Sequence, residues 1–383
     1  MFLAHASLIS NSGVSRFSWS SLRRYHHVPS VADGILYVHH LDKSHRQNAT
    51  KQASQIRHCL LQAKEYRDAA DAVSLATKPV LLYYSAMCLA LSQILFKGSG
   101  ADSLDRAREE HKHHGLVFSS APQQKSDYRL KSAAAGLVAR PMLNNGQRTG
   151  TFELWHRTAR EDPIIGQHNT NKGGNSTTNP VKVLFISGDN SLPPLPKTGI
   201  SFWDCLIGTP GMSDWLRQIG INSDIVKATI ALETTSDDAH AFILAVHPHA
   251  SKERIVEFQS DIACRPSDID RLHVSEGEGF FTLRANGRGL DNPVFSLPSA
   301  STWTNEDIRF LPHKTSLNEF GYIYVGLYIL GNYARYFPDR WMVDFESGSP
   351  LALAAAEFVS MAEWRMALLT LSELSRIYHV LRE

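Results

Sequence analysis

The chain has 383 residues, of which 43% are apolar and 20% are charged, close to the average of globular proteins. This composition excludes collagen-like, disulfide-framework and wholly disordered chains. Lysine and arginine number 39 against 38 for aspartate and glutamate. The formal net charge of +1 gives no strong overall field for nucleic acid or anionic lipid, although local patches can exist. At about 100–200 residues per domain, the length predicts two or three domains, or one core with a large insertion.

The four cysteines stand too far apart in the sequence for a zinc knuckle or a redox pair, so neither a metal nor a cofactor is predicted. Such thiols fit a reducing cytoplasm better than secretion. Residues 1–31 are basic, rich in serine and without acids, as in mitochondrial transit peptides, but an ordinary first segment with a basic face is favoured. The most apolar windows, 79–96 and 322–330, are interpreted as buried core helices, so no membrane contact is expected.

The N-terminal third is predicted to be helical. Apolar residues recur three or four apart over residues 47–76, which indicates an amphipathic helix. A second helix, Val80–Phe96, follows the start signal Thr77-Lys78-Pro79 and is apolar nearly all round, which is typical of the middle of a bundle. Leu130–Leu137 indicates a short helix, and residues 149–155 indicate the start of a strand.

The middle third has a β-rich pattern. Residues 166–180 are polar and glycine-rich, which indicates a linker. After this linker, β-prone runs are separated by turn residues, and Asn286-Gly287 is a tight-turn signal. The predicted strands are 181–186, 225–232, 241–246 and 279–284.

The C-terminal third returns to a helical pattern, with an apolar helix at Tyr322–Tyr333 and a long amphipathic helix at Leu351–Leu381. The predicted fold class is therefore α+β, a mainly helical core built from N- and C-terminal segments with an inserted β-rich lobe. The expected boundaries are an N-terminal helical region at 1–165, a β-rich insertion at 181–312, and C-terminal helices at 316–383 that pack on the N-terminal region.

Short motifs mark the helical parts. Residues 78–84, KPVLLYY, begin the apolar helix with Lys-Pro and end on a tyrosine pair. A His114-Gly115 turn follows, and further along stand the sequences GTFEL at 150–154 and ARYFP at 334–338, with Trp341 just beyond.

In order and approximate spacing over residues 50–383, these elements resemble the YaaC-like proteins. The pattern of that family is a KP-apolar-YY helix, an HG turn, a G-x-F-x-L element and an ARY-x-P…W element. The resemblance implies a bacterial protein of that fold in the cytoplasm. The activity of the family is unassigned, so the resemblance implies no chemistry.

The motif residues singled out are Lys78, Tyr83, Tyr84, His114, Arg335 and Arg340. If the two tyrosines are buried, their hydroxyls need hydrogen-bond partners, and a structural role that links the helix to its neighbours is favoured. The two arginines lie near Asp339 and Asp344 in the sequence. They can bind a phosphate or form structural ion pairs, and the sequence leaves both alternatives open.

The Tyr83-Tyr84 helix, with its small and apolar neighbours, and the charged turn at 106–114 give a fainter likeness to HEPN domains. HEPN domains are helical bundles in which an Arg-x(4–6)-His motif can cleave RNA without a metal. Arg106 and His111, like Arg108 and His113, are separated by four residues. Histidine as the base and arginine as the stabiliser of phosphorane charge meet the needs of that reaction. The alternative, a solvated charged turn, is favoured because charge runs are usually solvated faces.

Two functions follow as hypotheses, and whether the chain is an enzyme stays open. The first is a non-enzymatic or accessory protein that binds a partner, either a protein or RNA. The second is a HEPN-like metal-independent ribonuclease in defence against foreign nucleic acid. The second requires an arginine and a histidine to converge in an open basic cleft, commonly at a homodimer interface. The sequence contains no P-loop, no dinucleotide fingerprint after a strand and no nucleophile elbow.

Overall fold

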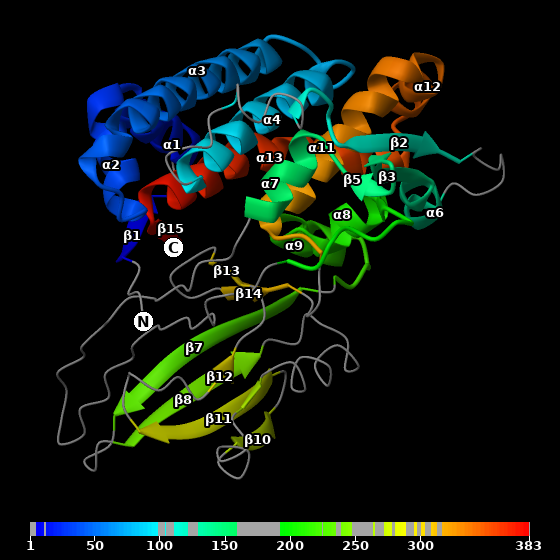
Figure 1. Ribbon diagram of the computed structural model, residues 1–383. Coiled ribbons are helices and arrows are strands. Elements are labelled where there is room, and N and C mark those ends of the chain that lie inside the picture. The colour runs from blue at the N-terminus through cyan, green and yellow to red at the C-terminus, as the bar shows by residue number, and fades with distance from the viewer. Residues whose placement is uncertain are drawn as a thin grey trace.

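A helical body and a sheet lobe make up the computed structural model (Figure 1). The structure describes residues 5–10, 13–98, 104, 111–121, 129–158, 192–223, 225–234, 239–246, 263–264, 272–277, 280–288, 295–296, 300–302, 308–311 and 316–382. The fold class is α+β and mainly helical, as the sequence predicts.

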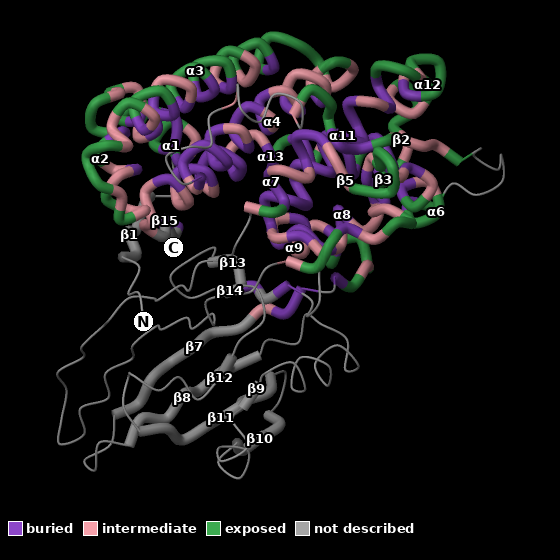
Figure 2. The backbone as a smooth tube through the Cα atoms, in the orientation of Figure 1, coloured by how far each residue is buried: buried purple, intermediate pink, exposed green. Residues whose placement is uncertain are grey.

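Helices from both ends of the chain form the body. Helix α4 lies in the middle and packs against α3, α7, α11 and α13, so its nearly all-round apolar sequence is explained by neighbours on several sides. Figure 2 shows buried residues along α4, α11 and α13. The main helices are α1 (Val14–Leu22), α2 (Val28–Val38), α3 (Arg46–Asp71), α4 (Lys78–Lys97), α11 (Glu319–Tyr336), α12 (Pro338–Ser347) and α13 (Pro350–Ser375), with short 3-10 turns at Arg23–His26 and Lys43–His45.

The two ends of the described chain are joined by a pair of strands. Strand β1 (His5–Ser10) pairs in parallel with β15 (Ile377–Arg382), and α1 packs on α13. The predicted helix 351–381 is therefore too long. It ends at Ser375 because Arg376 adopts a left-handed conformation, with φ 55°, that starts the strand.

A small sheet and four short helices cover one end of the body. The predicted strand at 149–155 is wrong, because this segment forms helix α7 with Phe152, Trp155 and His156 buried on one side. The elements are β2 (Leu116–Ser120), α6 (Leu130–Ala135), β3 (Leu137–Pro141), the hairpin β4 (Leu143–Asn144) and β5 (Gln147–Arg148), α7 (Thr151–Thr158), β6 (Ile200–Ser201), α8 (Phe202–Gly208), a 3-10 turn at Pro210–Met212, and α9 (Ser213–Gln218).

The sheet lobe is a six-stranded antiparallel sheet in the order β10-β11-β8-β7-β14-β13. A separate two-stranded pair is formed by β12 and β9. The strands are β7 (Val226–Thr234), β8 (Ala239–Val246), β9 (Ala263–Cys264), β10 (Leu272–Gly277), β11 (Phe280–Arg288), β12 (Phe295–Ser296), β13 (Ala300–Thr302) and β14 (Ile308–Phe310). The predicted strand at 181–186 lies outside the described residues.

The predicted turn at Asn286-Gly287 is wrong, since both residues lie inside β11 and pair with β8. The tight turn with this sequence is at Asn145-Gly146, where φ is 49° and 80° and the chain reverses from β4 to β5. The same dipeptide therefore has two conformations, because pairing with a neighbouring strand overrides the local turn preference.

One buried arginine connects the lobe to the body. Arg309 on β14 donates from Nη1 to the Pro210 carbonyl at 2.6 Å and from Nη2 to a carboxylate oxygen of Asp214 at 2.7 Å. Helix α8 packs on α11, so this part of the predicted 181–312 segment lies with the helical body. The three predicted domain boundaries stay a prediction.

Within the described residues, α4 is the one helix long and apolar enough to cross a membrane. Of its most apolar window, 72% is buried inside the protein, between the helices named above. A core position accounts for this composition.

Candidate functional site

Sequence motifs that lie far apart in the chain meet on one side of the helical body. The tyrosine pair stands on α4, the His-Gly turn leads into β2, and the Ala-Arg-Tyr sequence ends α11. Ring contacts and hydrogen bonds join their side chains. We call this group the aromatic–arginine cluster. Its members are Tyr66, Tyr83, Tyr84, His114, Tyr328, Arg335 and Tyr336.

The His-Gly turn is held by the start of α7. The backbone N–H groups of Thr151 and Phe152 donate to the carbonyls of His113 and His114, at 2.8 and 3.1 Å. Gly115 and Gly150 lie back to back with positive φ, and a Cβ on Gly150 would stand 2.3 Å from the Gly115 Cα. The two motif glycines therefore permit the close contact that places the His114 ring.

His114 lies over a buried tyrosine floor. Its Nδ1 is 2.8 Å from the Tyr83 hydroxyl, and its ring also contacts Tyr84 and Tyr328. The Tyr328 hydroxyl donates to the Leu116 carbonyl at 2.7 Å, which fixes the floor to β2. Burial raises the pKa of Tyr328 to about 12 and that of Tyr83 well above its ordinary value, so both phenols stay protonated at neutral pH.

The electrostatic surroundings of His114 are cationic. Partial burial lowers its pKa below the ordinary 6.5, and the charges of Arg335 and His113 lower it further. The imidazole is therefore neutral at pH 7. When the Tyr83 hydroxyl donates to Nδ1, the proton of the neutral ring stands on Nε2. Within the described part of the chain, that nitrogen has no hydrogen-bond partner.

Arg335 forms the exposed part of the cluster. Its Nη1 donates to the Tyr84 hydroxyl at 3.3 Å, and its guanidinium carbon lies 5.1 Å from the centre of the Tyr336 ring. Tyr84 in turn stacks on Tyr66, with ring centres 5.4 Å apart and planes at 27°. Tyr336 is 60% exposed. Arg335 and the Tyr336 ring are thus exposed at the surface, and Tyr66 and Tyr84 are partly exposed.

A second arginine–aromatic pair follows on α12. The Arg340 guanidinium lies 5.3 Å from the centre of the Phe337 ring, and Phe337 packs on Phe118 of β2. Asp344, one of the two nearby acids, accepts a hydrogen bond from the Tyr333 hydroxyl at 2.9 Å. Among the described residues, neither Arg335 nor Arg340 forms an ion pair. Of the two alternatives for these arginines, phosphate binding and structural ion pairs, the described residues therefore give no example of the second.

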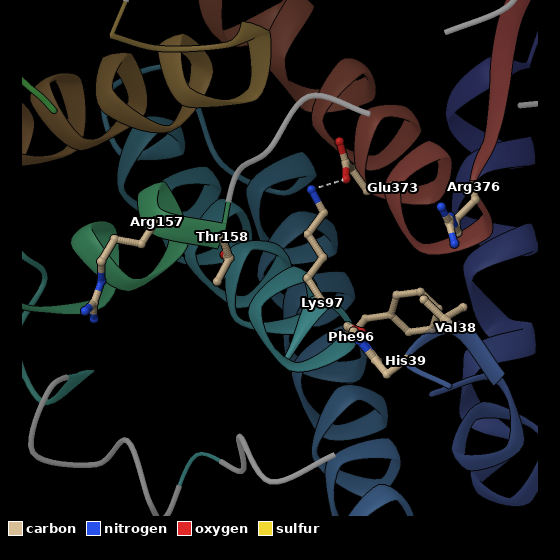
Figure 3. Close-up of a pocket in the computed structure, with 8 residues that line it drawn as sticks. All are labelled: Val38, His39, Phe96, Lys97, Arg157, Thr158, Glu373 and Arg376. Atoms are coloured by element: carbon tan, nitrogen blue, oxygen red, sulfur yellow. Dashed lines mark hydrogen bonds and ion pairs between the residues drawn. The ribbon is translucent and has the colours of Figure 1, made fainter. Parts of the chain in front are cut away.

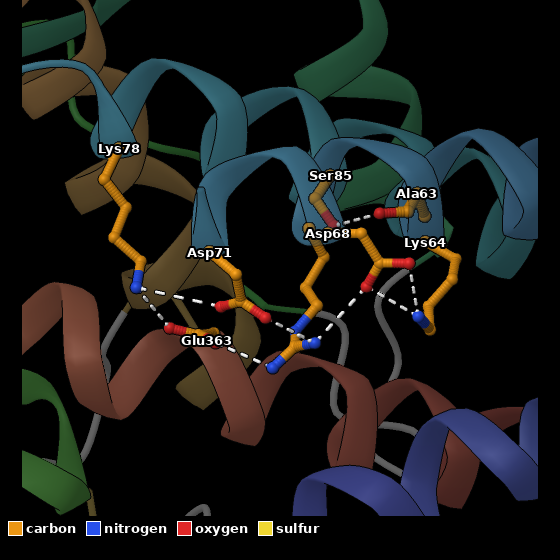
Figure 4. A network of polar contacts seen from close by, with 8 residues as sticks. Ala63, Lys64, Asp68, Asp71, Lys78, Ser85 and Glu363 are labelled. Atoms are coloured by element: carbon orange, nitrogen blue, oxygen red, sulfur yellow. Dashed lines mark hydrogen bonds and ion pairs between the residues drawn. The ribbon is translucent and has the colours of Figure 1, made fainter. Parts of the chain in front are cut away.

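Lys78 has different surroundings (Figure 4). Its Nζ lies 2.8 Å from Glu363 of α13 and 4.0 Å from Asp71 of α3. Arg67 contacts the same two acids at 2.9 and 2.8 Å. Burial and the neighbouring Glu363 raise the pKa of Asp71, whereas Lys78, Asp71 and Arg67 outweigh burial and hold the pKa of Glu363 below its ordinary value. This ion-pair network, Arg67, Asp71, Lys78 and Glu363, joins three helices.

The candidate RNA-cleaving residues do not form a described site. Arg106 and Arg108 lie outside the described residues. His111 is half-buried, and its Nε2 lies 2.8 Å from the Leu104 carbonyl, so this nitrogen is engaged within the protein. His113 is exposed, and its carbonyl accepts from Thr151. The pairing of these arginines with these histidines stays a prediction.

A cavity of about 390 Å³ lies elsewhere, where α2 and α4 end (Figure 3). Lys97 and Glu373 form an ion pair of 2.5 Å on one side of it, and His39 Nε2 lies 3.0 Å from the Phe96 carbonyl. Arg157 points away from this ion pair in Figure 3. The cavity contains none of the cluster residues.

The described residues offer few other reactive groups. Cys59, Cys88 and Cys205 are buried, and burial raises the pKa of the first two thiols to about 12, so they are not nucleophiles at neutral pH. No three histidine, cysteine, aspartate or glutamate side chains in the described part of the chain are grouped as metal ligands.

Sequence reasoning missed Tyr66, Tyr328 and Tyr336 as members of the cluster. Tyr336 lies next to Arg335 in a quoted motif, so it carried a signal. Tyr66 and Tyr328 belong to helix patterns that predict core packing alone. Only the packing of α3 and α11 against α4 brings them to the tyrosine pair.

Comparison with known proteins places the chain in a family without adding a chemistry. The searches of curated proteins and of solved structures found no match. The model of the family described as YaaC-like Protein matches residues 25–374. This match spans nearly the whole chain and contains all the motifs that build the cluster. The chain therefore belongs to the YaaC-like protein family.

Proposed function

We propose that this protein acts by binding a partner at the aromatic–arginine cluster and that it is an accessory protein, not an enzyme. One observation carries the proposal. The tyrosine pair, the His-Gly turn and the Ala-Arg-Tyr sequence come from three distant parts of the chain and meet at one partly exposed surface. Core packing does not require exposed members such as Arg335 and Tyr336 to lie there.

The chemistry of the cluster suits recognition. Tyrosine and arginine are enriched at the energetic centres of binding interfaces because they combine large contact area with directional hydrogen bonds. The buried Tyr83 and Tyr328 support the surface from below, and hydrogen bonds to His114 and to the Leu116 carbonyl fix their hydroxyls. A surface preorganised in this way loses little conformational entropy on binding.

A catalytic role has less support. The described thiols are buried and protonated. Among the described residues, the charged groups that act on His114 are Arg335 and His113, so no carboxylate in that part of the chain orients it as a base. For the ribonuclease alternative, the described His111 already contacts Leu104. We place the function in the cytoplasm, which is supported by the three cysteines whose side chains the structure describes, all of them free.

Site-specific photo-cross-linking in the native cells tests the proposal. The photo-cross-linking amino acid p-benzoylphenylalanine replaces Tyr336 in one full-length variant and Tyr37 in the other. Tyr37 is a matched control because it is also a tyrosine, is 82% exposed and lies on α2, which carries no cluster residue. We expect a cross-linked adduct from position 336 that position 37 does not give.

The dependence on the cluster is tested in the same cells. Replacing Arg335 and His114 together by alanine should abolish the adduct from position 336. The proposal is wrong if position 336 gives no adduct, if both positions give the same adduct, or if the double replacement leaves its yield unchanged.

A further inference from the structure

We propose that the partner bound at the aromatic–arginine cluster and the nearby Arg340 is a single-stranded nucleic acid, whose phosphates contact Arg335 and Arg340 and whose bases stack on the exposed Tyr336 ring and the partly exposed Phe337 ring. This inference rests on the proposed function, since it names the partner of the same surface. RNA and DNA share the phosphate and base chemistry involved, and the experiment below separates them.

The charge of Arg335 and Arg340 points to an anionic partner. Arg335 and Arg340 are exposed and form no ion pair within the described residues, although the exposed Asp339 stands between them in the chain. Arg335 uses one of its five N–H donors for the Tyr84 hydroxyl. The remaining donors form a planar fork that matches the oxygens of a phosphate.

The aromatic rings beside the two arginines suit the same partner. Each arginine lies against an aromatic ring, Arg335 on Tyr336 at 5.1 Å and Arg340 on Phe337 at 5.3 Å. Single-stranded nucleic acids are recognised by such combinations, in which cations contact the backbone and bases stack on aromatic or guanidinium planes. The two arginine–aromatic pairs lie close together in the chain and offer the same kind of contact twice. This suits a polymer in which a phosphate and a base repeat along the backbone.

A further neighbour of Arg335 is His114. Among the described residues, the charged groups that act on His114 are Arg335 and His113, both able to carry positive charge. Its Nε2 is without a partner in the described part of the protein, and in the tautomer in which Tyr83 donates to Nδ1 it can donate to a phosphate oxygen or a base edge. In that tautomer, an anion at this place meets donors and no carboxylate of the described residues.

The net charge of +1 makes long-range attraction weak, so the local contacts must supply the affinity. We expect a dissociation constant on the order of 1–100 μM at physiological salt, typical of binding without sequence readout. The affinity should fall as salt rises, because bound phosphates release counterions.

Fluorescence anisotropy with the full chain tests this inference. The probes are fluorescein-labelled oligouridylate and oligoadenylate of about 15 nucleotides, within the usual site sizes, and DNA strands of the same length. Replacing both Arg335 and Arg340 by glutamine should weaken binding at least about tenfold and reduce the salt dependence by about two phosphate contacts. Tyr336→Ala should weaken binding, whereas Tyr336→Phe should retain it because the stacking face is kept.

Arg23→Gln is the matched control, since Arg23 is an exposed arginine in the 3-10 turn after α1, outside the cluster. Its affinity should stay within about twofold of the native value. Stronger binding of RNA than of DNA, or the reverse, identifies the source of the phosphates. The inference is wrong if the native chain binds neither probe, or if the double arginine variant binds as the native chain does.

Nuclease digestion of the cross-linked adduct from position 336 separates this inference from the proposed function. An adduct that loses mass on nuclease treatment supports both. An adduct that keeps its full mass after nuclease treatment contradicts the nucleic acid and retains the binding surface. Absence of a cluster-dependent adduct contradicts the proposed function itself.

Discussion

The ion-pair network around Lys78 and the aromatic–arginine cluster both use side chains of α3 and α4, but the cations of the network are paired with acids and the arginine of the cluster is not paired within the described residues. In the network, Lys78 and Arg67 share Glu363 and Asp71, so each cation faces a carboxylate. In the cluster, Arg335 faces a phenol and an aromatic ring. Paired charges hold helices together, whereas an exposed cation without an acid is available to a ligand. Substitutions in the first should change stability, and those in the second should change binding.

The largest loss of stability is expected where a paired charge is fully buried. Arg365 and Glu319 join α13 to α11 through two hydrogen bonds of 2.7 and 2.8 Å, and their side chains are 2% and 4% exposed. Glu319→Gln leaves the guanidinium buried without its counter-charge, which should lower the free energy of unfolding by about 3–5 kcal/mol. Urea denaturation measures this. Glu65→Gln, at an exposed position of α3, is the control, and equal midpoints for the two variants would contradict the prediction.

A smaller loss is expected in the ion-pair network, whose members are partly exposed. Glu363→Gln should lower the free energy of unfolding by about 1–2 kcal/mol, between the values for surface and buried pairs. Its effect on nucleic-acid affinity should be negligible. A variant that binds more weakly while unfolding at the native midpoint would break the distinction between network and cluster.

The network also predicts a pH dependence of stability. Because the folded-state pKa of Glu363 is lowered, its contribution is present above its ordinary pKa of 4.5 and is lost as pH falls through the folded value. The raised pKa of Asp71 acts in the opposite direction and offsets part of this loss. Thermal unfolding followed from neutral to acidic pH should therefore show a shallower decline for Glu363→Gln than for the native chain.

Tyr83 supports the cluster from below, so its substitution should affect stability and binding moderately. Tyr83→Phe removes the hydrogen bond to His114 and should cost about 1 kcal/mol of unfolding free energy. The affinity should fall less than in the double arginine variant, because Arg335 is anchored by Tyr84 instead. A Tyr83→Phe variant that binds more weakly than the double arginine variant would assign the main contact to His114.

Acid should strengthen binding through His114. Its lowered pKa keeps the ring neutral at pH 7, and it gains a proton only as pH falls below 6.5, its ordinary value. Within the part of the chain that the structure describes, the groups that face it are Arg335, His113, Tyr83, Tyr84 and Tyr328. One added positive charge near a phosphate is worth up to about 1 kcal/mol in water, or about fivefold in affinity. Anisotropy at constant salt measures this increase, and His114→Gln should remove it; an unchanged increase would exclude His114 as its source.

The smallest effect on stability is expected at the surface of the cluster. Arg335→Gln removes an exposed side chain without an ion pair in the described structure, so the free energy of unfolding should stay within about 0.5 kcal/mol of the native value. Urea denaturation on the sample used for binding checks this. A loss as large as that of Glu363→Gln would mean that Arg335 holds the fold, and the contrast between the two regions would fail.

Local patterns predicted the helices and the fold class because those patterns have a direct physical cause. Helix α4 is apolar nearly all round, and only a central position buries such a helix. The same patterns failed where packing competes with local preference. The sequence of residues 149–155 resembles the start of a strand. In the structure, Gly150 contacts Gly115, and a helix begins at Thr151 and buries Trp155.

The candidate site shows the same division. The sequence alone determined that Tyr83, Tyr84, His114, Arg335 and Arg340 belong to motifs of one family, because motif order is a property of the chain. Which of them meet, and which of their charges pair with acids, follows from the three-dimensional packing alone. Those facts depend on the packing of helices far apart in the sequence, and no local preference encodes such long-range contacts.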